Sequence, residues 1–277
     1  MSESRITNYE SRQAAGLYIV GTPIGNLGDM SKRAQETLQS VDIIACEDTR
    51  VFGKLAEKFD IKTRRIAYHN HNELDAADKL IQRILAGESV ALVSDSGMPG
   101  ISDPGYRLIR AARSAGVYIT VIPGACAAIS ALVLSGFPTD RFTFCGFFKD
   151  EKHLREDNKL RHTIIYYESP NRIKDTIGIM ARVMPERRIA IVREITKMYE
   201  EVIIGYPSEL LNTKELKGEI VLVIEPAPDV KMSDDEISEI VRDVVSSGAK
   251  TKDAANEIAN RTGISKSEAY EKVIKHG

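Results

Sequence analysis

Side chains that can move a proton or hold a phosphate gather in three short segments of the sequence. CEDTR covers residues 46–50, HNHNE covers 69–73, and SDSGMPGISDPG covers 94–105. A carboxylate or a histidine within hydrogen-bond reach can take a proton from a reacting hydroxyl, and an arginine can hold a phosphate through two parallel hydrogen bonds. The catalytic candidates from the first and third segments are Glu47, Asp48, Arg50 and Asp95. HNHNE offers further proton acceptors, and the sequence leaves the choice among all of these open.

Each segment also has a purely structural interpretation. The carboxylates of CEDTR can cap a helix and pair with Arg50 at the surface. Asp95 can brace the glycine-rich loop to which it belongs. HNHNE can be a polar loop in which Asn72 caps the following helix. A metal site on His69 and His71 is not expected, because a pair spaced i, i+2 needs a strand and no third ligand is evident.

These segments must be positioned by the elements around them, and the first half of the chain alternates short apolar runs with amphipathic stretches. This alternation predicts βαβ units and a parallel sheet. The runs typical of buried strands cover residues 17–20, 41–46, 90–94 and 118–122, and the helical patterns cover 30–38, 51–58, 74–85, 106–115 and 125–134. Ligands of such sheets bind beyond the carboxyl ends of the strands. The segments that follow the four strands are GTPIGN, CEDTR, SDSGMPGISDPG and IPGACAA.

The second half is expected to be a further α/β domain, because its apolar runs are rich in β-branched and aromatic residues. Its strand candidates are RFTFCGFF, TIIYYE, RIAIVRE, EEVIIG and EIVLVIE. The domain plan that we predict is a flexible N-terminus over residues 1–15, an α/β domain with a parallel sheet over 16–136, a second α/β domain with a mixed sheet over 137–228, and a helical domain over 233–277.

The stretch from residue 233 onward is helical in pattern and carries no strand signal. Ser233 with Glu236 and Ser265 with Glu268 each fit a capping box, and Gly263 is expected to end the middle helix. The apolar positions are spaced for three helices that share a small core. Helix, helix, short turn and helix is the spacing of a helix-turn-helix unit.

The composition indicates an ordinary globular protein. The chain has 277 residues, of which 43% are hydrophobic, and a net charge of −2, which argues against nonspecific coating of nucleic acid but allows a local basic patch. Three scattered cysteines without CxxC spacing indicate neither disulfides nor zinc. The N-terminus lacks an apolar signal region, and no run of about eighteen apolar residues occurs, so we expect a cytoplasmic protein with no membrane span. Neither G-x-G-x-x-G nor a P-loop is present, which disfavours dinucleotide and ATP sites.

Eight segments of the chain together carry a family resemblance. They are LYIVGTPIGNLGDMSKRA, DIIACEDTR, HNHNE, VALVSDSGMPGISDPG, VIPGACAAISALVLSG, YYESPNRI, REITKMYEE and KGEIVLVIE, in this order over residues 17–225. In these segments the sequence resembles the tetrapyrrole methylase superfamily of S-adenosylmethionine-dependent enzymes. Within it, the wording of SDSGMPGISDPG and the helical tail resemble the branch that methylates the 2′-hydroxyl of a cytidine ribose in 16S ribosomal RNA of the small subunit.

The resemblance implies two α/β domains of the tetrapyrrole methylase (class III methyltransferase) type with the cofactor in the cleft between them, plus the small helix-turn-helix-like domain. The implied cofactor is S-adenosylmethionine, held largely by backbone groups. The implied partner is small-subunit ribosomal RNA or the assembled subunit, and relatives often form homodimers. The residues implied at the cofactor are Pro23, Ser94, Asp95, Ser96, Gly97, Met98, Ile101, Ser102, Pro123, Gly124, Ala125, Cys126, Tyr167, Glu168, Ser169, Gly218 and Glu219. The residues that we expect to contact RNA are Arg50, His71, Asn72, Arg193, Lys197, Lys252 and Lys266.

Two other functions compete with this interpretation. A methyltransferase for a tetrapyrrole or another small molecule would share the fold and the cofactor, but CEDTR, YESP and the helical tail argue against it. A ligand-sensing transcriptional regulator would use the helix-turn-helix unit, and its last helix should be basic near its start. That helix offers Lys266 but also Glu268 and Glu271, so the sequence disfavours DNA reading.

Overall fold

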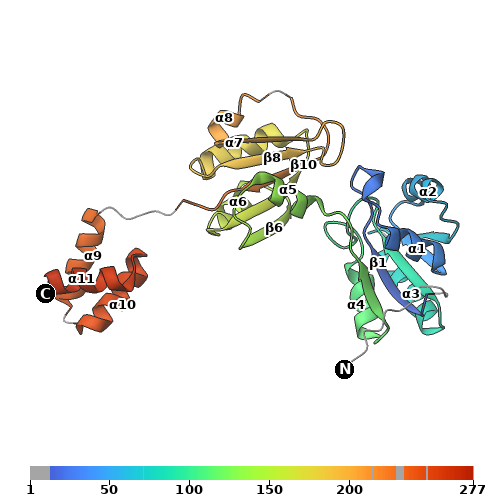
Figure 1. Cartoon of the computed structure of the whole chain (residues 1–277), viewed down its shortest axis with the longest axis horizontal. Helices are drawn as coiled ribbons and strands as arrows, with labels where there is room; N and C mark the ends of the chain where they lie inside the picture. The colour runs from blue at the N-terminus through green and yellow to red at the C-terminus, as the bar shows by residue number, and fades with distance from the viewer. Residues whose placement is uncertain (1–12, 71, 214, 229–233, 248, 277) are drawn as a thin grey trace. The chain divides into compact units, whose positions relative to one another are not determined.

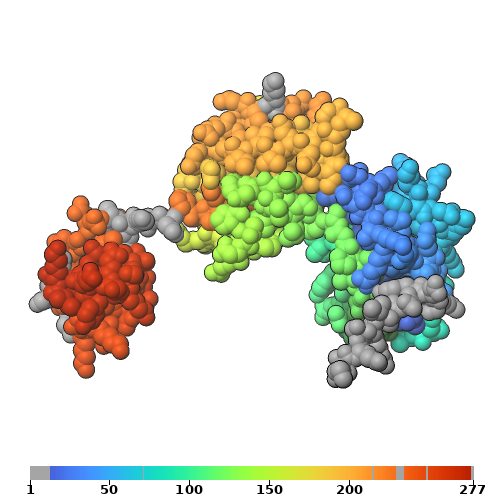
Figure 2. Space-filling view, in the orientation of Figure 1, coloured from blue at the N-terminus to red at the C-terminus, as the bar shows by residue number. Residues whose placement is uncertain are grey.

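The computed structural model describes residues 13–70, 72–213, 215–228, 234–247 and 249–276. The flexible N-terminus predicted for residues 1–15 therefore lies mostly outside the described residues, as do His71 and Ser233. The chain divides into two compact units, Met1–Ala227 and Pro228–Gly277, and each is described by itself (Figures 1 and 2).

A five-stranded parallel sheet forms the first half of Met1–Ala227. Its strands are β1 (Gly16–Val20), β2 (Ile43–Cys46), β3 (Arg64–Ala67), β4 (Ser89–Val93) and β5 (Ile119–Ile122), in the order β3-β2-β4-β1-β5. The three central strands are buried along their whole length, which explains their continuous apolar runs. The predicted parallel sheet is confirmed.

Helices cover both faces of this sheet. One face carries α1 (Lys32–Ser40) and α2 (Thr49–Lys58), and the other carries α3 (Glu73–Leu85) and α4 (Tyr106–Ser114). A short 3-10 helix, η1 (Leu27–Asp29), precedes α1. Because both faces are covered, the loops at the carboxyl ends of the strands are the part of this sheet that can receive a ligand.

Strand β3 was not among the predicted strands. It lies at the edge of the sheet and is largely exposed, and its RRIA sequence begins with two arginines. Charged residues at an edge discourage pairing with another chain, and they also remove the apolar pattern that marks a strand in the sequence.

The second sheet is mixed. Its strands are β6 (Phe142–Phe147), β7 (Thr163–Glu168), β8 (Ile189–Arg193), β9 (Glu201–Gly205) and β10 (Ile220–Ile224), in the order β6-β7-β10-β8-β9. Strands β6 and β7 are parallel, and the other neighbours are antiparallel. All five strand candidates of this region form strands. The helices that accompany them are α6 (Glu151–Asp157), α7 (Ile173–Val183) and α8 (Pro207–Leu210).

Helix α5 (Ala127–Ser135) links the two sheets and packs on the second one. Its buried Ala128, Ala131 and Leu132 belong to the same apolar cluster as Val192 and Val223 of the second sheet. We expected the boundary between the two α/β parts near residue 136, after this helix. By packing, the change from the first sheet to the second comes before α5, because its apolar face is covered by β7, β8 and β10.

The unit Pro228–Gly277 is a three-helix bundle. Helices α9 (Asp234–Ser246), α10 (Thr251–Thr262) and α11 (Lys266–His276) enclose a small core that includes Ile237, Val241, Ile258 and Val273. Gly263 ends α10 in the left-handed conformation, as predicted. The Ser265 hydroxyl accepts a hydrogen bond from the Glu268 amide at 3.1 Å, which is one half of the predicted capping box.

Among the described helices of both units, none combines the length and the apolar character that crossing a membrane requires.

Candidate active site

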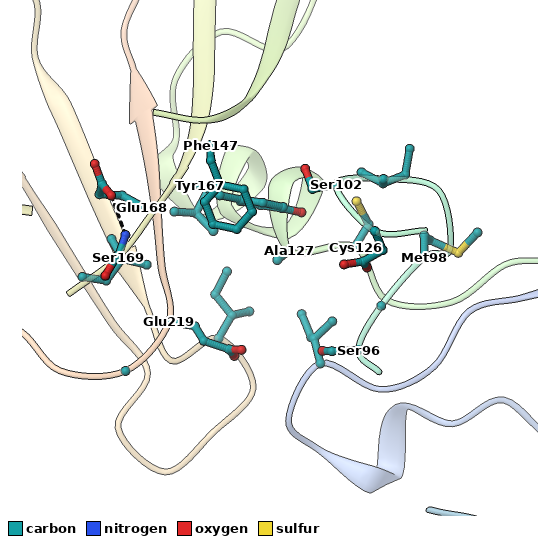
Figure 3. Close-up of a pocket in the computed structure, with 18 of the residues that line it drawn as sticks. Ser96, Met98, Ser102, Cys126, Ala127, Phe147, Tyr167, Glu168, Ser169 and Glu219 are labelled. Atoms are coloured by element: carbon teal, nitrogen blue, oxygen red, sulfur yellow. Dashed lines mark hydrogen bonds between the residues drawn. The ribbon is translucent and has the colours of Figure 1, made fainter. Parts of the chain in front are cut away.

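A cavity of about 390 Å³ lies where loops of the first sheet meet the second sheet (Figure 3). The first half of the unit contributes Ile24, residues 96–98 and 101–103 of the loop after β4, and Cys126 and Ala127 at the start of α5. The second half contributes Phe147, residues 167–170 around the end of β7, Ile195, and residues 218–221 around the start of β10. The cavity therefore lies beyond the carboxyl ends of the parallel strands, the usual place for a ligand.

The loop after β4 forms one wall, and hydrogen bonds to its backbone carbonyls hold it in place. The Ser94 hydroxyl donates to the carbonyl oxygen of Ser96 at 3.1 Å, and the Thr22 amide donates to the carbonyl of Gly97 at 2.9 Å. Gly97 has a φ of 75°, and a Cβ there would lie 3.2 Å from Ile24 Cγ2 and 3.4 Å from the Ala125 carbonyl oxygen. Glycine at this position thus keeps the wall thin and leaves backbone groups accessible to a ligand.

Aromatic side chains of the second sheet form another wall. The Tyr167 ring meets Phe144 edge to face with 4.8 Å between centroids, and meets Phe147 likewise at 5.5 Å. Figure 3 shows Tyr167 and Phe147 together above the cavity, between Glu168 and Ser169 on one side and Ser102 and Cys126 on the other. Burial raises the pKa of Tyr167 to about 12, so the phenol stays neutral at physiological pH.

The carboxylate of Glu168 is used within the second half itself. Its oxygens accept hydrogen bonds from the Ser169 amide at 2.6 Å and the Thr176 hydroxyl at 2.6 Å, and Arg172 pairs with it at 2.8 Å. The side chain is buried and its partners lie at the start of α7. Glu168 lines the cavity, but its carboxylate is committed to holding this turn in place.

Most residues expected at the cofactor do line the cavity. They are Ser96, Gly97, Met98, Ile101, Ser102, Cys126, Tyr167, Glu168, Ser169, Gly218 and Glu219. The expected residues that do not line it are Pro23, Ser94, Asp95, Pro123, Gly124 and Ala125. Ser94 is buried behind the loop, and Gly124 packs against the backbone of the first loop, where a Cβ would come 2.7 Å from the Gly21 Cα. These two positions shape the cavity from behind.

Three charged side chains, Glu194, Lys197 and Glu219, form what we call the clasp at the edge of the cavity. The Lys197 ammonium donates to Glu194 at 2.8 Å and to Glu219 at 2.7 Å. Burial alone would lower the pKa of Lys197, but these two hydrogen bonds raise it above its ordinary value. Lys197 was expected to hold RNA phosphate, whereas here its charge is neutralised by two carboxylates.

The loop that carries the clasp also joins the two halves of the unit. The Asn26 amide donates to the Thr196 hydroxyl at 3.1 Å, and the stem of Lys197 lies against Gly25. Glu194 and Thr196 both have positive φ, 51° and 67°, which costs energy in residues other than glycine. A loop held in such a conformation by contacts on both sides is a fixed part of the site.

A second hollow of about 380 Å³ adjoins the cavity and shares Ile24, Ser96 and Glu219 with it. It is lined by the first loop, by α2, and by Asp95 and Lys197. Pro23, expected at the cofactor, lies here together with Asp95. The two hollows meet at the loop after β4, so a group in one can approach a group in the other.

In the CEDTR segment the structure shows helix capping and surface pairing, the structural alternative that the sequence allows. Asp48 caps α2 by accepting a hydrogen bond from the Arg50 amide at 2.8 Å, and the Arg50 guanidinium binds the same carboxylate through two hydrogen bonds. The hydrogen bonds from Arg50 lower the pKa of Asp48 well below its ordinary value. Asp95 in turn accepts a hydrogen bond from the Asp48 amide at 3.1 Å. Neither Asp48 nor Arg50 lines the cavity.

HNHNE also supports the loop after β4. Glu73 accepts hydrogen bonds from the Tyr68 hydroxyl at 3.1 Å and the Gly105 amide at 3.2 Å, and it pairs with Arg107 at 3.2 Å. Asn72 precedes α3 and accepts from the His69 amide at 2.9 Å instead of capping the helix with its side chain. Within the described residues, no three histidine, cysteine or acidic side chains are grouped as ligands of a metal would be.

The residues expected to contact RNA are divided between the two units. Arg193 pairs with Glu201 at 2.7 Å, so this arginine is also engaged. Lys252 on α10 and Lys266 on α11 are exposed. His71 lies outside the described residues.

One carboxylate at the cavity was missed by the sequence reasoning. Asp103 lines the cavity near the end of the loop after β4. Burial and the nearby charge of Glu47 raise the pKa of Asp103 to about 6, with a smaller contribution from Asp95, while a hydrogen bond from Ser94 acts in the opposite direction. In the sequence Asp103 precedes a proline and a glycine, the pattern of an ordinary turn. Its presence in a loop longer than a βα connection needs was the available signal. The apolar lining residues Ile24, Phe147, Ile195 and Val221 were also missed.

Fold and cavity together define an α/β enzyme whose small-molecule site lies at the carboxyl ends of a parallel sheet and is completed by a second sheet. Residues 16–211 match the family of tetrapyrrole (corrin/porphyrin) methylases, and this chain belongs to that family. It is an S-adenosylmethionine-dependent methyltransferase. The predicted family, enzyme class and cofactor are confirmed.

Two relatives and one solved structure illustrate the similarity. The chain is 40% identical over 270 residues to the ribosomal RNA small subunit methyltransferase I of Bacillus subtilis (strain 168), with 92% of each chain covered. It is 47% identical over 220 residues to the protein of the same name from Vibrio cholerae serotype O1 (strain ATCC 39315 / El Tor Inaba N16961), with 75% of this chain and 76% of that one covered. A uroporphyrin-III-C-methyltransferase from Thermus thermophilus has a TM-score of 0.54 at 20% identity, covering 76% of this chain and 94% of that one. At that identity the likeness is one of fold.

Proposed function

We propose that this chain transfers a methyl group from S-adenosylmethionine to the 2′-hydroxyl of a cytidine ribose in small-subunit ribosomal RNA. The observation that carries the proposal is the 40% identity to a ribosomal RNA small subunit methyltransferase I over 92% of both chains. The choice of a cytidine ribose rests on the resemblance of the SDSGMPGISDPG loop and the helical tail to the branch described above.

The cavity between the sheets suits this cofactor. Its volume of about 390 Å³ falls within the range of about 300–1,000 Å³ usual for small-molecule sites. Backbone groups of residues 96–98 can bind the polar parts, and Ile24, Met98 and Tyr167 offer apolar surface. When bound, S-adenosylmethionine supplies an electrophilic methyl group on a positively charged sulfur. The carboxylate of Glu219 in the lining is complementary to that positive charge.

We assign the second hollow to the ribose acceptor. It adjoins the cofactor cavity at Ser96 and Glu219, so the 2′-hydroxyl of a nucleotide held there can enter the cofactor cavity beside the methyl donor. Holding the two reactants in line is worth several kcal/mol, by the usual effect of proximity and orientation. In this arrangement Asp95 lines the acceptor hollow, and Glu47, Asp48 and Arg50 belong to the segment that leads into α2 behind it. Lys252 and Lys266 contact phosphates away from the modified ribose.

Labelled methyl transfer separates this proposal from its rivals. Purified small ribosomal subunits that lack the modification, and a tetrapyrrole acceptor, are each incubated with the full chain and methyl-labelled S-adenosylmethionine. We expect label in the RNA, and in a dinucleotide that resists alkali, because alkaline cleavage uses the ribose 2′-hydroxyl as its nucleophile. Label in the tetrapyrrole, or in RNA that alkali fully degrades to labelled mononucleotides, contradicts the proposal.

The proposal also includes the oligomeric state and the cellular compartment of the protein. Exposed apolar side chains from the edge strand β5 and from α5, namely Val121, Ile129, Val133 and Leu134, support a homodimer. Sedimentation velocity tests this, and a monomer at micromolar concentration contradicts it. The proposed substrate puts the activity in the cytoplasm.

A further inference from the structure

We propose that Asp103 is the proton acceptor in methyl transfer, an inference that rests on the proposed function. In this step the ribose 2′-oxygen forms a bond to the methyl carbon while the carbon–sulfur bond breaks and its electron pair stays on sulfur. The hydroxyl proton passes to the Asp103 carboxylate. The neutral thioether, the methylated ribose and the protonated carboxyl group account for all atoms and charges.

The position of Asp103 is the first argument. Among the described residues, three carboxylates line the cavity, those of Asp103, Glu168 and Glu219. The buried Glu168 carboxylate accepts hydrogen bonds from the Ser169 amide and the Thr176 hydroxyl and pairs with Arg172. The Glu219 carboxylate accepts a hydrogen bond from the Lys197 ammonium. Within the described residues Asp103 forms no ion pair, and the polar group beside it is the uncharged Ser94 hydroxyl. Of the three, Asp103 is the carboxylate that can accept a further proton without breaking a charged contact.

The loop fixes Asp103 in place. Ser102, the residue before it, has a φ of 65°, a conformation that serine adopts only at a cost in energy. On the other side, the Gly105 amide donates to the buried Glu73 carboxylate at 3.2 Å, so the end of the loop is tied to α3. A proton acceptor needs such fixed geometry, because it must lie within hydrogen-bond reach of the reacting hydroxyl.

The surroundings of Asp103 make it a stronger base than an ordinary aspartate. Glu47 at the end of β2 and Asp95 at the end of β4 face it with like charge, Tyr167 approaches from β7, and His69 faces Glu47. Burial and these charges raise the pKa of Asp103 to about 6. The carboxylate is therefore mostly ionised at neutral pH, near the value that suits a general base.

The other carboxylates near the site are engaged elsewhere. Asp48 caps α2 and pairs with Arg50. Asp95 accepts a hydrogen bond from the Asp48 amide. Glu73 holds the start of α4. Glu47 does not line the cavity, and it acts on Asp103 through its charge.

The first test replaces Asp103 by its isosteric amide. In single-turnover transfer to small subunits at saturating cofactor and RNA, Asp103→Asn should lower the rate by about 100-fold, the usual contribution of a general base. Cofactor affinity by calorimetry should stay within about threefold of wild type, because the amide keeps the shape of the loop. Asp78→Asn, an exposed carboxylate on α3, is the matched control and should change neither quantity. A rate within about tenfold of wild type, or an equal loss of cofactor affinity, overturns the assignment.

The second test measures the pH dependence of kcat/KM for the cofactor. This dependence reports the pKa values of the essential groups in the free enzyme. Wild type should lose activity as the pH falls through about 6, because the Asp103 carboxylate becomes protonated. Glu47→Gln removes a negative charge beside Asp103, lowers the pKa of Asp103, and should move this acidic limb to lower pH. An acidic limb that Glu47→Gln leaves in place overturns the assignment. Failure of the proposed function would appear separately, as wild-type enzyme that puts no methyl group on ribose.

Discussion

At the residue scale, the loop after β4 depends on backbone positions that few side chains tolerate. Gly97 combines a φ of 75° with close approach of Ile24 and the Ala125 carbonyl. The loop is further held by Ser94 and Thr22, whose hydrogen bonds end on the carbonyls of residues 96 and 97. A thin, fixed wall of this kind presents its amides and carbonyls to a ligand and needs no charged side chain to bind it.

Replacing Gly97 by leucine should therefore abolish cofactor binding. The side chain would have to enter the cavity or displace Ile24, and the left-handed backbone adds a cost of about 1–2 kcal/mol. Isothermal titration with S-adenosylmethionine measures the effect, and thermal unfolding checks that the variant folds. Gly116→Leu is the matched control, because Gly116 has a φ of 65° and a Cβ added there would have no neighbour within 4 Å. Gly116→Leu has the same backbone cost but no side chain at the cavity. Equal cofactor affinity of the two leucine variants would therefore contradict the role of Gly97 in the cavity wall.

Residue types in the sequence identified the loops but not the partners of each side chain. SDSGMPGISDPG was expected to line the cofactor site, and residues 96–98, 101 and 102 do line the cavity. Asp103 escaped notice because an aspartate before proline and glycine has the pattern of a turn. Asp48 and Arg50 are catalytic candidates by residue type, but in the structure Arg50 donates hydrogen bonds to the Asp48 carboxylate two residues before it. Such pairings depend on side-chain direction, which spacing alone does not give.

At the scale of elements, the clasp connects the loop after β8 to the start of β10. Lys197 is about three-quarters buried and donates to both Glu194 and Glu219. Glu194 also packs over Gly218, where a Cβ would come within 2.3 Å of its Cδ. These contacts fix the part of the second sheet that completes the cavity.

Lys197→Met should loosen this part of the cavity. Methionine keeps most of the stem but leaves Glu194 and Glu219 facing each other without a cation, so their repulsion should open the loop. We expect cofactor affinity to fall by about tenfold, equivalent to about 1.4 kcal/mol. Calorimetry measures the affinity, and Lys174→Met on α7 is the control for loss of an exposed lysine. If Lys197→Met weakened RNA binding and its salt dependence but left cofactor affinity unchanged, Lys197 would contact an RNA phosphate, as expected from the sequence.

The elements themselves were largely predictable, and the exceptions have physical reasons. Strands β1, β2 and β4 have continuous apolar runs because both of their faces are buried. Strand β3 shows no such run because it lies at an exposed edge. The position of α5 was also not evident, because an apolar helix between two sheets can pack on either one. Only the three-dimensional contacts assign it to the second sheet.

At the scale of the whole molecule, the chain consists of two compact units. The unit Pro228–Gly277 has a small core of its own, formed by α9, α10 and α11. Its Lys252 and Lys266 are exposed, whereas Arg261 pairs with Asp243 at 2.9 Å. The proposed role of this unit is to bind phosphates of the substrate RNA.

Ending the chain at residue 230 should separate cofactor binding from RNA binding. Cofactor affinity should be unchanged, because the described residues that line the cavity all lie before residue 222. Affinity for small subunits should fall by about tenfold and depend less steeply on salt, because fewer phosphates are neutralised. Filter binding over a salt series measures this, and full-length chain with Lys252→Glu and Lys266→Glu should show the same change. Wild-type affinity and salt slope in the truncated chain would show that the unit does not dock RNA.

The central claim is that the cavity between the two sheets serves methyl transfer to a ribose of small-subunit RNA. Nucleoside mass spectrometry tests it most directly, on RNA from unmodified small subunits incubated with S-adenosylmethionine and the full chain. We predict one new nucleoside, 2′-O-methylcytidine, formed by wild type and by Gly116→Leu but absent with Gly97→Leu. A methyl group on a base, or 2′-O-methylcytidine formed equally by the Gly97→Leu enzyme, would contradict the account.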